Sequence, residues 1–190
     1  EHCQSGSERV LKAYRQLQQT DPKLLASDWI INIQGDEPLL PLESIEALVE
    51  ALPHFETAGI YIATLGYPLP SEPKERAKHL NSPSVVKVIC AALERNLACQ
   101  PQHSQTEHWQ KALFFTRKAI GNAQHIGVYA FHKNFLQRMT NTRSPLSKIE
   151  DLEQLTWLEA GESIGVVQLK NSHPPGVDTI EDLSLKAQMY

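Results

Sequence analysis

Two carboxylates follow apolar residues at points where the chain turns, in positions suited to binding a metal ion. Residues 32–41 read NIQGDEPLLP and place Asp36 after an apolar run, while PPGVDTIEDL at 174–183 places Asp178 after Val177. In proteins, Mg²⁺ favours one or two carboxylates together with the phosphate oxygens of a substrate. Asp36 and Asp178 are therefore candidate ligands of a magnesium ion that also holds a phosphorylated substrate.

Both aspartates also have a structural interpretation. Gly, Asp and Pro favour turns, so GDEP at 35–38 is compatible with a plain acidic turn. Gln34 favours a site, because a buried amide needs hydrogen-bond partners. Asp178 stands beside an expected helix start, where Asp is a common cap, but Thr179 with Asp182 already supplies a capping box there. Both interpretations stay open for both residues.

A third carboxylate, Glu153, falls on the apolar side of an expected helix. On a helical wheel of about 100° per residue, it lies between Ile149 and Trp157, on the stripe that also carries Leu152 and Thr156. A buried carboxylate is costly unless it has a partner. Sugar hydroxyls would serve as partners, so the position indicates sugar binding, with a structural partner in the core as the alternative.

Helices and strands that alternate along the chain must position these side chains. Short apolar runs bounded by turn residues predict strands at 28–33, 59–66, 85–93, 112–117, 126–132 and 163–169. The first of these reads as a strand buried on both faces. Helical spacing predicts a helix at 5–17 with Ser5 or Ser7 as its N-cap, and another at 178–190. A further helix at 42–52 carries one stripe of Ile45, Leu48, Val49 and Leu52.

The clearest helix is predicted at 144–162, where Ser147 with Glu150 forms a capping box and Gly161 is a natural stop. Residues 71–84 are expected to be a loop or short helix, and 94–110 are expected to be mobile. The alternation predicts a single α/β domain over 1–190, with a layered, mostly parallel central sheet and helices on both faces. Ligands of such sheets bind beyond the carboxyl ends of the strands, where Asp36 would stand.

Composition and charge exclude several classes of protein. Of the 190 residues, 41% are apolar and 21% are charged, which is typical of a globular domain. A net charge of −4 without a basic block argues against nucleic acid and anionic membranes as partners. No apolar run reaches the roughly 18 residues that span a bilayer. Cys3, Cys90 and Cys99 are odd in number and lack CxxC spacing, which favours a reducing cytoplasm over a disulfide framework or zinc site.

Seven stretches occur in an order that resembles one enzyme family: SGSER, NIQGDEPLLP, NSPSVVKV, ALFFTR, HIGVYAF, SPLSKIEDLEQL and GVDTIEDL. Together they resemble the CMP-Kdo synthetases (3-deoxy-manno-octulosonate cytidylyltransferases) over nearly the whole chain. The resemblance implies a Rossmann-like nucleotidyltransferase fold. It also implies that CTP and Kdo give CMP-Kdo and pyrophosphate for lipopolysaccharide biosynthesis, with Mg²⁺ as cofactor. A cytoplasmic homodimer is expected, with the subunit contact near 112–117 and the following loop.

The resemblance also assigns roles to individual residues. Asp36 and Asp178 match the metal-binding aspartates of the family. The positions that match its Kdo pocket are Gln34, Arg117, His125, Tyr129, Glu153 and Gln154. The segment near the nucleotide is matched by Ser5, Gly6 and Arg9, with Arg9 a candidate partner for a phosphate or the sugar carboxylate. Plainer interpretations are a loop histidine for His125, a core residue for Tyr129 and a solvated strand-end charge for Arg117.

The sequence departs from the family pattern in two places. The family begins with a strand and a Gly-rich basic loop of the pattern STRLPGKPL, which grips the triphosphate, so the amino-terminal part is expected to be absent here. The stretch 117–127 is also shorter than in the family. The alternatives are a non-catalytic sugar-binding remnant or a related sugar or sialic acid nucleotidyltransferase. An unrelated Mg²⁺-dependent hydrolase would need a nucleophile or water-activating base that the sequence does not show.

Overall fold

The computed structural model describes residues 3, 5–21, 23, 26–35, 37, 40–93, 106–139 and 142–171. Asp36, Asp178 and the helix expected at 178–190 lie outside these residues. The helices are α1 (Gly6–Thr20), α2 (Leu42–Thr57), α3 (Pro73–Asn81), α4 (Lys133–Arg138), α5 (Pro145–Glu150) and α6 (Gln154–Glu159). The strands are β1 (Trp29–Asn32), β2 (Ile62–Pro68), β3 (Lys87–Ala92), β4 (Thr106–Thr116), β5 (Ala123–His132) and β6 (Ile164–Leu169).

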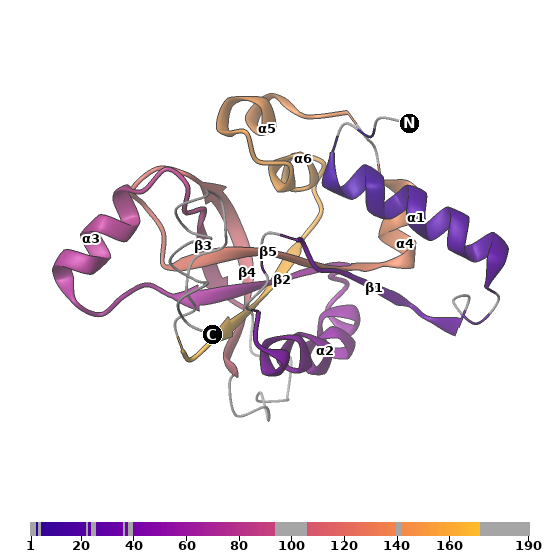
Figure 1. Ribbon diagram of the computed structural model, residues 1–190, viewed down its shortest axis with the longest axis horizontal. Coiled ribbons are helices and arrows are strands. Elements are labelled where there is room, and N and C mark those ends of the chain that lie inside the picture. Colours follow the sequence, from indigo (N-terminus) through magenta and orange to yellow (C-terminus); the bar gives the residue numbers. More distant parts are fainter. Residues whose placement is uncertain are drawn as a thin grey trace.

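All six expected strands are confirmed, and Figure 1 shows them as one strongly twisted sheet. Two of the strands begin earlier than expected. Residues 106–110 belong to β4 although they were expected to be mobile, and β5 begins at Ala123. The N-cap of α1 is Ser5, whose side chain accepts a hydrogen bond from the Glu8 amide at 3.2 Å. In α2, Val49 was placed on the buried stripe but is 49% exposed.

The prediction of a mostly parallel sheet is wrong. The strand order is β1-β5-β2-β6-β4-β3, and among the described strands only β2 and β6 pair in parallel. Strand β3 also pairs with β5, so the strands β5, β2, β6, β4 and β3 form a closed, barrel-like sheet. No described helix separates β3 from β4 or β4 from β5, so these connections need not produce parallel neighbours.

The unit β1–α2–β2 explains why alternation suggested parallel pairing. Both strands pair antiparallel to β5, which lies between them, so β1 and β2 run in the same direction without touching as neighbours. Among the described strands, β1 pairs only with β5 and so lies at one edge of the sheet that they form. All four of its residues are half-buried, whereas the sequence interpretation placed them in a strand buried on both faces.

Helices cover both faces of the sheet, as predicted (Figure 1). On one face, α2 packs Leu48 and Phe55 against β2 and β6 in one core cluster. On the other face, α1, α4 and α6 contribute Leu11, Leu136 and Trp157 to the second cluster. Successive strand residues divide between the two, so that Ile62 lies in the second cluster and Ala63 in the first. The core therefore holds α1 and α6 against the same face of the sheet.

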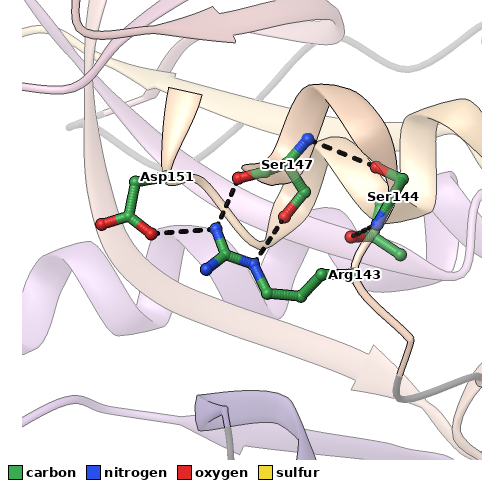
Figure 2. Close-up of polar contacts among 5 residues, drawn as sticks. Arg143, Ser144, Ser147 and Asp151 are labelled. Carbon is green, nitrogen blue, oxygen red and sulfur yellow. Dashed lines mark hydrogen bonds and ion pairs between the residues drawn. The ribbon is translucent and has the colours of Figure 1, made fainter. Parts of the chain in front are cut away.

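The helix expected at 144–162 is divided into α5 and α6, and the predicted capping box is wrong. Ser144 is the N-cap of α5, and Asp151 ends this helix in the left-handed conformation with φ 53°. Figure 2 shows Arg143 closing the break, because its guanidinium donates to Ser147 Oγ, the Ser147 carbonyl and Asp151 Oδ1. Gly161 follows α6 with φ 85°, as expected for a stop. The break leaves Glu153 just before α6 rather than within a long helix.

No helix in the described part of the chain is both long enough and apolar enough to cross a membrane.

Candidate functional site

A cavity of about 230 Å³ lies on the face of the sheet that α1 and α6 cover. It brings together residues from the start of α1, the end of β1, strand β5 and the α5–α6 break. Of the residues predicted to form a sugar pocket, all six line this cavity: Gln34, Arg117, His125, Tyr129, Glu153 and Gln154. Their grouping is a finding of the structure, because they come from segments more than a hundred residues apart.

Strand β5 supplies the floor of the cavity through His125, Gly127 and Tyr129. A register shift opposite Leu65 lets this stretch bulge from the β2 pairing. Gly127 permits the close approach of Gln34, since a Cβ on this glycine would lie 3.0 Å from the Gln34 amide carbon. The bulge and the glycine together bring the Gln34 amide against the floor.

The His125 ring is enclosed and uncharged. Its ring centroid lies 5.0 Å from that of Phe115 and 5.3 Å from that of Tyr129. Burial lowers the pKa of His125 from 6.5 to about 3, because an imidazolium there would lose its hydration. At neutral pH the ring can therefore donate one hydrogen bond and accept another.

This shift predicts a loss of stability in mild acid. In the unfolded chain His125 takes up a proton near pH 6.5, whereas in the folded chain it does so only near pH 3. The contribution of the neutral ring is thus present above pH 6.5 and is lost as the pH falls towards 3. Its slope is about 1.4 kcal/mol per pH unit within that window. Denaturant unfolding between pH 7.5 and 4.5 should show a shallower slope of unfolding free energy against pH for His125→Gln than for the wild type. Equal slopes for wild type and His125→Gln would contradict the assignment.

Tyr129 presents a hydroxyl that lacks a partner. The side chain is 6% exposed, and its Oη makes no hydrogen bond with the described residues. Burial first, and then the charge of Glu153, raises the pKa of this phenol well above its usual value. The group is therefore a protonated donor beside the cavity, at a position where a buried polar atom normally has a partner.

Glu153 has a protein partner at the start of α1. The Ser7 amide donates to Glu153 Oε2 at 3.3 Å, and the Ser7 hydroxyl contacts Oε1. A carboxylate is favourable there, because the first amides of a helix carry a partial positive charge. Glu153 thus joins the α5–α6 segment to α1 while it also lines the cavity.

Two cations hold the wall opposite α1. The buried Lys87 ammonium donates to the carbonyl oxygens of Ser82, Val85 and Arg117 at 2.8–3.0 Å. Burial, and then the charge of Arg117, lowers the Lys87 pKa. Arg117 Nη1 donates to the Pro83 carbonyl at 2.8 Å, so this guanidinium is fixed at the edge of the cavity.

The three residues expected near a nucleotide are only partly grouped. Gly6 lines the cavity, whereas Ser5 serves as the α1 cap. Arg9 is exposed and lines a neighbouring groove of about 790 Å³ between α1 and β1.

Several residues of the site were missed by the sequence interpretation. Ser7 was considered only as a cap, although it holds Glu153. Gln124 lines the cavity, and its Oε1 accepts a hydrogen bond from His79 Nε2 at 2.8 Å. A signal existed for Lys87, because a lysine inside the apolar stretch VVKVI needs partners. No pattern in the sequence pointed to Thr64, whose hydroxyl contacts His125 Nε2.

Asp36 and Asp178, the predicted metal ligands, lie outside the described residues. The described residues contain no group of three or more His, Cys, Asp or Glu side chains placed to hold a metal ion. Glu37, beside Asp36, lines the cavity.

A family model for cytidylyltransferases matches residues 1–164. The 3-deoxy-manno-octulosonate cytidylyltransferase of Xylella fastidiosa (strain Temecula1) is 36% identical over 95% of this chain and 67% of its own length. That of Chloroherpeton thalassium is 36% identical over 97% of this chain and 67% of its own length. The chain spans about two thirds of the length of these relatives.

A solved structure of CMP:2-keto-3-deoxy-manno-octonic acid synthetase, in complex with CTP, superposes with a TM-score of 0.72. It is 26% identical, and the match covers 99% of this chain and 70% of that one. The fold and the matched family model define an α/β nucleotidyltransferase of the cytidylyltransferase class. Within that class, the chain belongs to the family of the 3-deoxy-manno-octulosonate cytidylyltransferases.

Proposed function

We propose that this chain takes part in the transfer of CMP from CTP to 3-deoxy-manno-octulosonate (Kdo), with release of pyrophosphate. The observation that carries the proposal is the polar cavity in which six side chains predicted for a Kdo pocket meet. The names of the relatives favour Kdo over sialic acid as the sugar. CTP is bound in the solved synthetase that superposes on the chain.

The side chains suit a hydroxylated sugar acid. Arg117 is the cation at the cavity edge and is assigned to the sugar carboxylate, since guanidinium groups bind carboxylates well. Tyr129 donates to a sugar oxygen, and Glu153 and Gln154 accept from or donate to its hydroxyls. A cavity that pairs hydroxyls in this way rejects compounds without them, because its own polar groups would be left unpaired.

In the proposed reaction, the anomeric hydroxyl of Kdo attacks the α-phosphorus of CTP. A new phosphorus–oxygen bond forms, the bond to the bridging oxygen breaks, and pyrophosphate leaves with the electron pair while the hydroxyl loses its proton. Asp36 and Asp178 are proposed to hold Mg²⁺, which would neutralise charge on the phosphates. The cavity residues contribute by fixing the sugar in the orientation for attack.

The setting of the reaction is also a proposal. Kdo is activated for lipopolysaccharide biosynthesis in the cytoplasm, where CTP is supplied. A homodimer is proposed through the end of β4 and the following loop, where Leu113 is 56% and Ile120 is 55% exposed.

The proposal is tested in a full-length protein that contains this chain together with the triphosphate-binding loop of the family. CTP, MgCl₂ and Kdo are added and pyrophosphate release is followed, with N-acetylneuraminate in a parallel reaction. Pyrophosphate release is expected in the reaction with Kdo and not in the reaction with N-acetylneuraminate. Release with N-acetylneuraminate alone would identify a related enzyme. Calorimetric binding of Kdo without any release would indicate a sugar-binding protein that does not catalyse transfer.

The unpartnered hydroxyl of Tyr129 gives a second test, in which stability and binding change in opposite directions. Tyr129→Phe should leave the free protein equally stable or more stable by about 1 kcal/mol, because a buried unsatisfied group is removed. Kdo affinity should fall roughly five- to tenfold, the value of one hydrogen bond. Denaturant unfolding and calorimetry measure the two effects. A loss of stability with unchanged Kdo affinity would show that Tyr129 is a core residue only.

A further inference from the structure

The Thr64 hydroxyl lies at the centre of the β5 irregularity beneath the cavity. Thr64 belongs to β2, is completely buried and sits opposite Tyr129, whereas the next residue, Leu65, is opposite Ile126. The shift in register leaves residues 127 and 128 without partners on β2. The Thr64 Oγ1 fills the gap, at 2.7 Å from the Val128 carbonyl oxygen and 3.2 Å from that of Ile126.

The same oxygen also lies 3.1 Å from His125 Nε2. A hydroxyl has one hydrogen to donate, and carbonyl oxygens only accept. The Thr64 hydrogen is therefore directed at a carbonyl, of which Val128 is the nearer, and the hydroxyl oxygen is left as an acceptor for His125. His125 must then carry its hydrogen on Nε2. The low pKa of the ring agrees with this assignment, because a neutral imidazole carries a single hydrogen.

The other ring nitrogen, Nδ1, is consequently an acceptor. Nδ1 makes no hydrogen bond with the described residues. It is also absent from the described side-chain atoms that are both fully buried and unpaired. The His125 ring lines the cavity and is held edge-on by Phe115, so the Nδ1 lone pair, which no described residue uses, can accept a hydrogen bond from a ligand. The group that meets it must be a hydrogen-bond donor, such as a hydroxyl.

We propose that Thr64 is a positioning residue that fixes His125 as the Nε2–H tautomer, so that the cavity offers Nδ1 to a hydroxyl of the bound sugar. The identity of the sugar rests on the proposed function, whereas the tautomer does not. Thr64 thereby links the β-bulge to the recognition of a ligand that it does not touch.

The tautomer can be observed directly by NMR of protein labelled with ¹⁵N-histidine. Long-range ¹⁵N–¹H spectra distinguish a protonated from an unprotonated ring nitrogen. The chain has 8 histidines, and the signals of His125 are identified by their absence in His125→Gln. The expected result for the wild type is a protonated Nε2 and an unprotonated Nδ1. A protonated Nδ1 would overturn the proposal, and this measurement needs no ligand and no variant of Thr64.

Two variants separate positioning from packing. Thr64→Val keeps the shape but removes the acceptor, so both tautomers should become populated and the two nitrogen shifts should approach each other. Thr64→Ser keeps the hydroxyl and should retain the wild-type pattern. Kdo affinity by calorimetry should fall about tenfold in Thr64→Val and recover in Thr64→Ser, with CTP affinity unchanged. A Thr64→Val protein with lowered stability but the wild-type His125 spectrum would show a structural role only, and would refute the proposal.

Titration with Kdo distinguishes this inference from the proposed function. Kdo bound through His125 should shift the Nδ1 signal and leave Nε2 nearly unchanged. If Kdo does not bind the wild type, the proposed function fails while the tautomer result stands. If Kdo binds without moving the Nδ1 signal, the role of His125 as an acceptor is refuted while the sugar assignment stands.

Discussion

Glu153→Ala is expected to weaken Kdo binding by roughly 30- to 150-fold, or about 2–3 kcal/mol, the scale of hydrogen bonds to a charged group. The carboxylate lines the cavity, and the sugar hydroxyls that donate hydrogen bonds to it would lose a charged partner. The same change should lower the free energy of unfolding by about 1–3 kcal/mol, because the Ser7 amide and hydroxyl lose their acceptor. Calorimetry with Kdo and CTP separately, and denaturant unfolding, measure these effects. CTP affinity should change little.

Ser7→Ala is the matched control for this experiment. Ser7→Ala removes the hydroxyl partner of Glu153 and leaves the carboxylate in place. It therefore reproduces most of the lost Ser7–Glu153 contact of Glu153→Ala without removing the carboxylate from the cavity. We expect Ser7→Ala to lower stability but to keep Kdo affinity within a few-fold of wild type. Glu153→Gln should lie between, since it retains an acceptor for Ser7 without the charge. If Ser7→Ala and Glu153→Ala weakened Kdo binding equally, Glu153 would act only by joining α1 to the α5–α6 segment.

The Glu153 example shows what the sequence could predict and what it could not. Its place on an apolar stripe with Trp157 correctly indicated a carboxylate in need of a partner. The stripe was derived from one continuous helix, whereas the chain breaks at Asp151 in a left-handed conformation. Across that break, Arg143 donates hydrogen bonds to Ser147 and Asp151 (Figure 2). Local periodicity does not reveal such a side-chain network, so the helix was predicted too long.

Strand positions were predictable because apolar runs are local, but their pairing was not. The alternation of β1, α2 and β2 suggested adjacent parallel strands. Strand β5, from residues far along the chain, enters between them and makes both pairs antiparallel. Only the long-range competition for hydrogen-bonding edges decides this order. The site follows the same logic, since Gln34 and His125 were predicted by resemblance, while Thr64 is defined only by its cross-strand contacts.

Gly165→Ala is expected to be among the most destabilising single changes in the core. A Cβ at this position of β6 would lie 2.6 Å from Cε1 of the Phe55 ring, well inside van der Waals contact. Phe55 is completely buried between α2 and the sheet, so its ring cannot avoid the added methyl group by turning out into solvent. Overpacking of this kind costs about 3 kcal/mol, a large share of the roughly 5–15 kcal/mol that stabilises a domain. Denaturant unfolding of the purified variant measures the loss.

In the sequence, Gly165 is only a small residue in an apolar strand. The structure explains the glycine, because the Phe55 ring from α2 occupies the space that a side chain at Gly165 would need. Two variants test this reason. Gly35→Ala, where an added Cβ meets nothing within 4 Å, should leave stability nearly unchanged. In the double variant Phe55→Leu with Gly165→Ala, the smaller side chain makes room for the methyl group. The double variant should therefore lose less stability than the two single variants lose together. Simple additivity in this pair would show that Gly165 is required by the backbone of β6 and not by its contact with Phe55.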